Sequence, residues 1–120
     1  MSRVWPGLEG RTYAFADMVA GGALLQLGSD APVAPLDPWL AMSAAVGRKT
    51  PDGSVWSPDQ RLTAEEALAA SVNGAGPVAV GCPADLVLLA EDPLRLGAEE
   101  LADVCPVATM VAGAVAHQRI

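Results

Sequence analysis

The chain has 120 residues and a formal net charge of -7 at pH 7, with 52% hydrophobic and 18% charged residues. This length suffices for one small domain but not for a complete (β/α)8 barrel of roughly 250 residues. The acidic balance argues against nucleic-acid binding, the apolar content argues against disorder, and no run of about 20 residues is apolar enough to span a membrane.

The first part of the chain predicts a helix followed by one buried strand. Apolar residues recur at three- and four-residue steps from Leu8 to Gly22, which is typical of an amphipathic helix. The apolar run from Ala23 to Gly28 ends in a Gly-Ser-Asp turn, which is typical of a parallel strand buried on both faces. The stretch from Ser29 to Pro38 holds three prolines and is predicted to be a structured loop.

Two further helices are predicted from their start signals. Asp37-Pro38 combines a good N-cap residue with a proline at the first helical position, and the helix that follows places three residues on one face: Trp39, Met42 and Val46. Residues 47–59 are predicted to be a loop. The third helix starts at Thr63, where Glu66 can complete a capping box, and it ends near Ser71.

The last part of the chain predicts a small antiparallel sheet. Ala84 to Ala90 is expected to be a strand and Ala98 to Asp103 a single helical turn. Pro106 to Val111 and Ala114 to Gln118 are expected to form a hairpin around Ala112-Gly113. The predicted class is therefore α/β, with a helical part over residues 1–75 and strands over residues 76–120.

The candidate catalytic residue is Asp30, which follows the predicted buried strand after Gly28 and Ser29. Enzymes with parallel sheets place their chemistry at this end of the strands. An aspartate in this position is more often only the cap of the next helix, so position alone leaves both interpretations open. Ser29 is not part of a Ser-His-Asp triad, because no suitable histidine is available.

Two other side chains are weaker candidates for substrate contact. Trp39 could line a cleft wall near Asp30, although its position after Asp37-Pro38 is more typical of a simple helix start. Arg48 could pair with a substrate carboxylate, although a solvated arginine at a helix C-terminus is the more common arrangement.

The other conspicuous residues are expected to have structural roles. Cys82 and Cys105 have no Cys or His at ligand spacing and are predicted to be free, partly buried thiols. His117 is the only histidine, is expected to be exposed, and cannot form a multi-histidine metal centre. Trp5 and Trp56 are expected to anchor loops. The first ten residues show no apolar signal core, so we expect a cytoplasmic protein.

Several strings of the sequence occur in a characteristic order. They are ALLQLGSDAPV at 23–33, LDPW at 36–39, AVGR at 45–48, LTAEEAL at 62–68, ADLVLL at 84–89 with DPL at 92–94, and TMVAGAV at 109–115. This series resembles the C-terminal part of the metal-dependent amidohydrolase superfamily. The resemblance is strongest to the YtcJ-like branch (amidohydrolase family 3), which includes N-substituted formamide deformylases.

The resemblance implies a fold and a role for one residue. Residues 1–75 would supply the last strand and helices of a (β/α)8 barrel, and residues 76–120 the C-terminal strands of a flanking β-sandwich. Asp30 matches the aspartate that ends the eighth barrel strand and lies at the zinc-type metal of the family. That aspartate accepts a proton from the metal-activated water that attacks the carbonyl of a C–N bond.

The metal-binding histidines of the family have no match in this chain, since His117 corresponds to none of them. The resemblance therefore implies a fragment that binds zinc weakly and is inactive alone, while the complete protein would hydrolyse a small amide. Two alternatives stay open: a subunit of a split enzyme completed by a partner chain, and a non-catalytic α/β remnant that self-associates.

Overall fold

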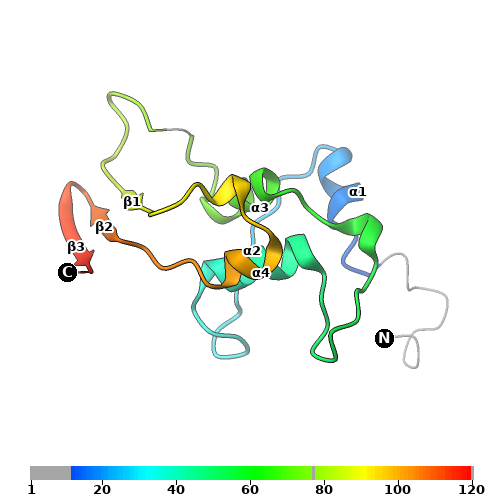
Figure 1. Ribbon diagram of the computed structural model, residues 1–120. Coiled ribbons are helices and arrows are strands. Elements are labelled where there is room, and N and C mark those ends of the chain that lie inside the picture. The colour runs from blue at the N-terminus through cyan, green and yellow to red at the C-terminus, as the bar shows by residue number, and fades with distance from the viewer. Residues whose placement is uncertain (1–11, 77, 120) are drawn as a thin grey trace.

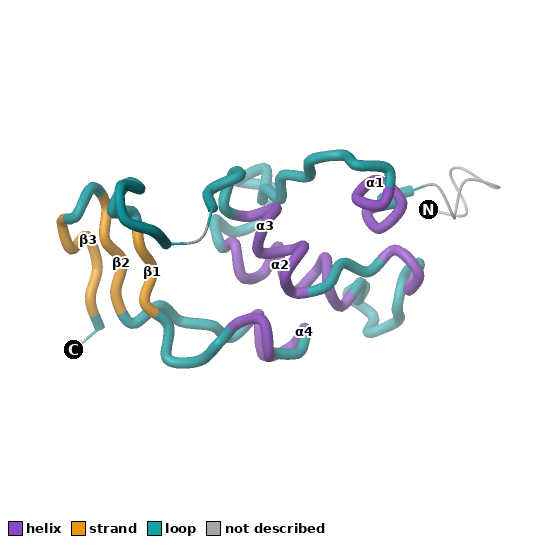
Figure 2. The backbone as a smooth tube through the Cα atoms, turned by 90° about the horizontal axis from the view of Figure 1, so that it is seen from above, coloured by secondary structure: helices purple, strands orange, loops and turns teal. Residues whose placement is uncertain are grey.

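The computed structural model describes residues 12–76 and 78–119, in which a helical cluster lies at one end and a small sheet at the other (Figure 1). The view from above shows the same separation, with α4 on the stretch of chain that leaves the sheet after β1 and returns to it at β2 (Figure 2). The Cα radius of gyration is 16.0 Å, whereas a compact domain of this length has about 14 Å. The chain is therefore elongated, with extents of 50 × 31 × 28 Å.

The first helix is shorter than its sequence pattern predicts. Helix α1 spans Phe15–Ala20, because Tyr13 has a φ of 54°, which interrupts a helix before it. The predicted start at Leu8 lies outside the described residues. The predicted end is confirmed, since the helix stops before Gly22, whose φ is 83°.

The second helix begins where the sequence predicts it. Helix α2 spans Pro38–Gly47, and its N-cap Asp37 accepts a hydrogen bond from the backbone N–H of Trp39 at 2.9 Å. Met42 is buried, and Trp39 and Val46 pack around the same core, so the predicted shared face is confirmed. The connection that follows ends in a short 3-10 turn over Pro58–Gln60.

The third helix has the predicted capping box. Helix α3 spans Ala64–Ser71, the Thr63 hydroxyl accepts from the Glu66 N–H at 3.1 Å, and the Glu66 carboxylate accepts from the Thr63 N–H at 2.8 Å.

Replacing Thr63 with alanine is expected to lower the free energy of unfolding by about 1 kcal/mol, because the N–H of Glu66 loses its acceptor. Thr63→Ser is the matched control, since it keeps the hydroxyl and should change stability by much less. Urea denaturation followed by circular dichroism measures both variants. Equal losses for the two variants would show that the hydroxyl is not the stabilising group.

The predicted buried strand from Ala23 to Gly28 is wrong for this structure. These residues are extended, but they pair with no strand in the described part of the chain. Leu24 is 98% exposed, and the Leu27 N–H donates to the carbonyl of Ala70 at 2.9 Å. A buried parallel strand requires neighbouring strands, and the only described sheet lies elsewhere.

The sheet has three antiparallel strands in the order β1-β2-β3, which are Leu86–Leu88, Ala108–Val111 and Ala114–Gln118. The hairpin between β2 and β3 turns at Ala112 and Gly113, with φ values of 49° and 79°, which confirms the predicted turn. Asp85 accepts from the Ala112 N–H at 2.7 Å and ties β1 to this turn. Strand β3 is exposed throughout, so the sheet is not covered by the described residues.

The core is small and lies among α2, α3 and α4, the last of which spans Ala98–Ala102 and is joined to β1 through a 3-10 turn over Pro93–Arg95. Its fully packed members are Met42, Ala45, Leu62, Ala67 and Leu101. Gly47 lets α2 and α4 approach each other, because an added Cβ would lie 2.9 Å from the Cβ of Ala98.

Three remaining predictions concern exposure and membrane spans. Cys82 and Cys105 are free as predicted, but both are exposed rather than partly buried, since they lie in loops outside the helical core. His117 is exposed on β3, as predicted. Among the described residues, every helix is too short to cross a bilayer.

Candidate functional site

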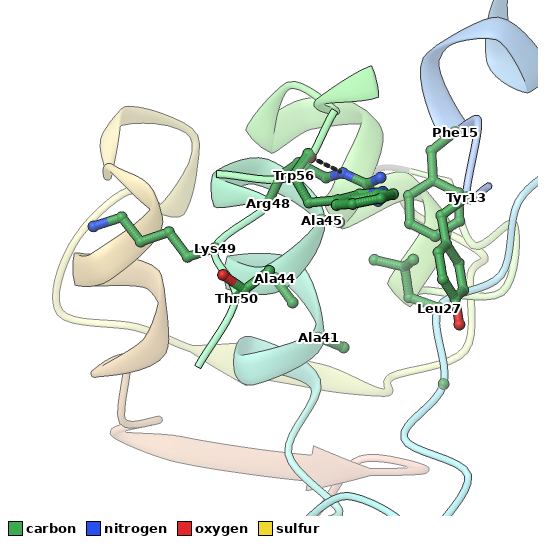
Figure 3. Close-up of a pocket in the computed structure, with 11 residues that line it drawn as sticks. Tyr13, Phe15, Leu27, Ala41, Ala44, Ala45, Arg48, Lys49, Thr50 and Trp56 are labelled. Carbon is green, nitrogen blue, oxygen red and sulfur yellow. Dashed lines mark hydrogen bonds between the residues drawn. The ribbon is translucent and has the colours of Figure 1, made fainter. Parts of the chain in front are cut away.

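One pocket lies beside the C-terminal half of α2, facing the segment before α1 and the end of the extended run (Figure 3). Its volume is about 480 Å³, within the usual range for small-molecule pockets. Most of its wall is apolar or aromatic, and none of the described residues that line it is acidic. The lining residues are Tyr13, Phe15, Leu27, Gly28, Ala41, Ala44, Ala45, Arg48, Lys49, Thr50 and Trp56.

Arg48 is the charged group on the buried side of this pocket. It follows α2 with a φ of 54° and is only 8% exposed, so the prediction of a solvated arginine is wrong. Its Nε donates to the carbonyl of Trp56 at 3.3 Å, and its guanidinium carbon lies 5.1 Å from the ring centroid of Phe15. Figure 3 shows the guanidinium directed toward Phe15 and away from the Lys49 side chain. Its Nη2 is buried and has no hydrogen-bond partner within residues 12–76 and 78–119.

Burial also changes the electrostatics of Arg48. Desolvation lowers the pKa of its guanidinium from the ordinary value, and Tyr13 raises it to a smaller extent. An arginine nevertheless stays protonated at any physiological pH. The pocket therefore carries a positive charge that has lost much of its hydration.

Two other charged side chains in or near this pocket, Lys49 and Asp52, have polar partners of their own. Lys49 forms an exposed ion pair with Glu99, and this partner lowers the pKa of the Glu99 carboxyl. In the turn that follows, Asp52 accepts hydrogen bonds from Thr50 and Ser54, which lower the pKa of Asp52 to about 2. Of the two cationic residues that line this pocket, Lys49 has an anionic partner among the described residues and Arg48 has none.

Asp30 is exposed and lies two residues beyond Gly28, which lines the pocket. It has a left-handed φ of 52°, and its carbonyl accepts from the Val33 N–H at 2.9 Å. The alternative that Asp30 caps the next helix is not realised, because Asp37 caps α2. The carboxylate is held at the end of the extended segment and is left open to solvent.

Trp39 does not line the pocket, since it packs against the helical core instead. The structure brings Arg48 together with Leu27 and Gly28, near the start of the turn that carries Asp30. Sequence reasoning assigned Trp56 a packing role and missed its carbonyl as the acceptor for Arg48. Trp5 lies outside the described residues.

A metal site cannot be assembled from the described residues alone. No group of three or more His, Cys, Asp or Glu side chains gathers anywhere in residues 12–76 and 78–119. Asp30 would supply one carboxylate, whereas a bound zinc ion needs three or four protein ligands. The residues present therefore do not fit a complete metal centre.

Comparison with known proteins identifies the family. A family model described as the amidohydrolase family matches residues 2–117. The chain is 30% identical over 119 residues to an N-substituted formamide deformylase of Arthrobacter pascens, covering 91% of this chain and 22% of that protein. It is 27% identical over 120 residues to the amidohydrolase YtcJ of Bacillus subtilis strain 168, covering 89% of this chain and 23% of that protein.

The match with a third relative is shorter. The protein LONG AFTER FAR-RED 3 of Arabidopsis thaliana is 35% identical over 89 residues, which cover 65% of this chain and 15% of that protein. The chain thus spans less than a quarter of the length of these curated relatives. No solved structure matches it significantly. Because the family match extends over almost all of its residues, the chain belongs to the amidohydrolase family.

Proposed function

We propose that the chain is the C-terminal part of a metal-dependent amidohydrolase whose complete form hydrolyses non-peptide C–N bonds of the amide or formamide type. The match over residues 2–117 and the name of the deformylase relative support this reaction class. In this proposal residues 1–75 contribute the end of a (β/α)8 barrel, and residues 76–120 contribute strands of a flanking β-sandwich.

The observation that carries the proposal is the unpaired extended segment that leads to Asp30. Leu24 is 98% exposed, and this apolar run has the composition of a strand buried on both faces. A strand-like segment with an unpaired backbone is a ready partner for other strands. Neighbouring barrel strands from the rest of the complete protein would cover both Leu24 and this backbone, and Asp30 would then lie at the carboxyl end of the barrel, where catalytic residues are placed.

Asp30 is the residue of this chain that we assign to the reaction. Its exposed carboxylate can accept a proton from a water molecule and release it to a leaving amine. The metal of the complete enzyme, zinc in our proposal, requires histidine ligands from outside this chain, so Asp30 would contribute one carboxylate to that site. Trp39 remains a predicted substrate contact, but its core packing favours a structural role.

A second possibility is supported by the apolar surface of the sheet. Val87, Leu88, Val111 and Val115 are each more than half exposed, and exposed apolar side chains on a sheet with free edge strands favour association with another chain. A second copy of this chain, or a partner chain that completes the flanking β-sandwich, would cover them.

The test is an assay of the 120-residue chain with and without its proposed complement. Alone, the chain is expected to retain less than stoichiometric zinc after dialysis and to hydrolyse no N-substituted formamide. Co-expression with a form of the Arthrobacter pascens deformylase that lacks the aligned segment is expected to restore hydrolysis. Stoichiometric zinc and turnover by the chain alone would contradict the proposal that it is one part of the catalytic unit.

A further inference from the structure

The pocket beside α2 contains a buried cationic donor without an acceptor. Arg48 is 8% exposed, and its Nη2 has no hydrogen-bond partner among the described residues. Buried polar groups in native proteins are nearly always paired, and an unpaired charged donor is especially costly. The C-terminal end of the α2 dipole attracts a cation, but it does not provide Nη2 with an acceptor.

We propose that this pocket binds a small organic carboxylate with an aromatic or aliphatic body, which pairs with the Arg48 guanidinium. The fork of N–H donors on an arginine matches the two oxygens of a carboxylate. The Nε bond to Trp56 is long, at 3.3 Å, so the guanidinium can tilt toward a bound anion without losing a strong contact. Asp30 is not among the residues that line this pocket, and the proposed binding does not depend on the proposed hydrolysis.

The pocket wall explains why the ligand needs an apolar body. Phe15, Leu27 and Trp56 surround the space next to the guanidinium, and Ala41 and Ala44 leave room along α2. The chain has a net charge of -7, but the described part of the pocket lining contains no Asp or Glu. An anion would be repelled by most of the molecular surface and attracted by this pocket.

The experiment titrates the 120-residue chain with phenylacetate and, separately, with the neutral analogue phenylacetamide. Isothermal calorimetry gives the affinities, and the Nε–Hε NMR signal of Arg48 reports contact with the carboxylate. Phenylacetate is expected to saturate the chain and shift this signal, and phenylacetamide is expected to bind at least tenfold more weakly. No saturation by phenylacetate, or equal binding of the two compounds, would overturn the proposal.

Variants separate the pocket from general charge effects. Arg48→Met is expected to weaken phenylacetate binding at least tenfold. Arg48→Lys is expected to weaken it at least fivefold, because lysine keeps the charge but not the planar fork of donors. Ala41→Leu fills the pocket without touching Arg48, and it should weaken binding even if Arg48→Met fails to fold. Arg95→Met removes the same charge at an exposed site outside the pocket and should leave binding unchanged. Equal losses for Arg95→Met and the pocket variants would show nonspecific attraction and overturn the proposal.

Discussion

Replacing Leu101 with alanine is expected to lower the free energy of unfolding by roughly 2–5 kcal/mol. Leu101 is fully buried in α4 and is one of the two largest side chains that are completely enclosed in the described structure. It fills the space against Met42 and Ala45 of α2, so its removal leaves a cavity where the helices meet. A small domain has a total stability of about 5–15 kcal/mol, so this loss could unfold much of the population.

The matched control for this variant is Leu24→Ala. It removes the same atoms from a side chain that is 98% exposed, so its effect on stability should be below about 0.5 kcal/mol. Urea denaturation followed by circular dichroism at 222 nm compares the two variants. A Leu101→Ala midpoint equal to that of Leu24→Ala would show that the helices do not pack in solution as described.

The features that the sequence predicted correctly are determined by local interactions. The cap at Asp37 and the capping box at Thr63 depend on residues within three positions of each other. The hairpin turn at Ala112 and Gly113 likewise requires only two residues with positive φ between short strands. Such signals can be read from sequence because no distant part of the chain has to be known.

The features that the sequence did not predict correctly depend on distant contacts. The run from Ala23 to Gly28 has the composition of a buried strand, but pairing requires strands that the described residues do not provide. Arg48 looked like a solvated residue, because nothing local shows that Phe15 and Trp56 enclose it. The burial predicted for Cys82 and Cys105 was wrong for the same reason, since the burial of a loop residue depends on what packs against the loop.

The candidate site also combines features that are local in the sequence with features that depend on distant contacts. The sequence itself places Asp30 directly after the apolar run, and its catalytic role stays a prediction. The grouping of Arg48 with Leu27 and Gly28 could not be predicted, because these residues are 20 positions apart and meet only through the packing of α2 against the extended segment. The helix starts and the hairpin turn are encoded here in local signals, whereas the core and the pocket arise from long-range packing.

Asp30→Asn is expected to abolish most hydrolysis in the reconstituted enzyme, with kcat/KM reduced by about 10²–10⁴-fold, the usual contribution of a general acid or base. The amide cannot accept the proton, but asparagine tolerates the left-handed φ of 52° as well as aspartate does. The stability of the isolated chain should therefore be unchanged, and urea denaturation checks this. Loss of stability together with activity would instead indicate a structural role.

The control for Asp30→Asn is the same substitution at Asp37. It removes a carboxylate seven positions further along the chain, but asparagine caps a helix as well as aspartate, so α2 keeps its start. Activity in the complementation assay should be unaffected by Asp37→Asn. If Asp30→Asn retained kcat/KM within threefold of the unmodified chain, the proton transfer would have to be assigned to another residue. A large loss confined to position 30 would connect the unpaired extended segment with catalysis, because this segment fixes where the carboxylate lies.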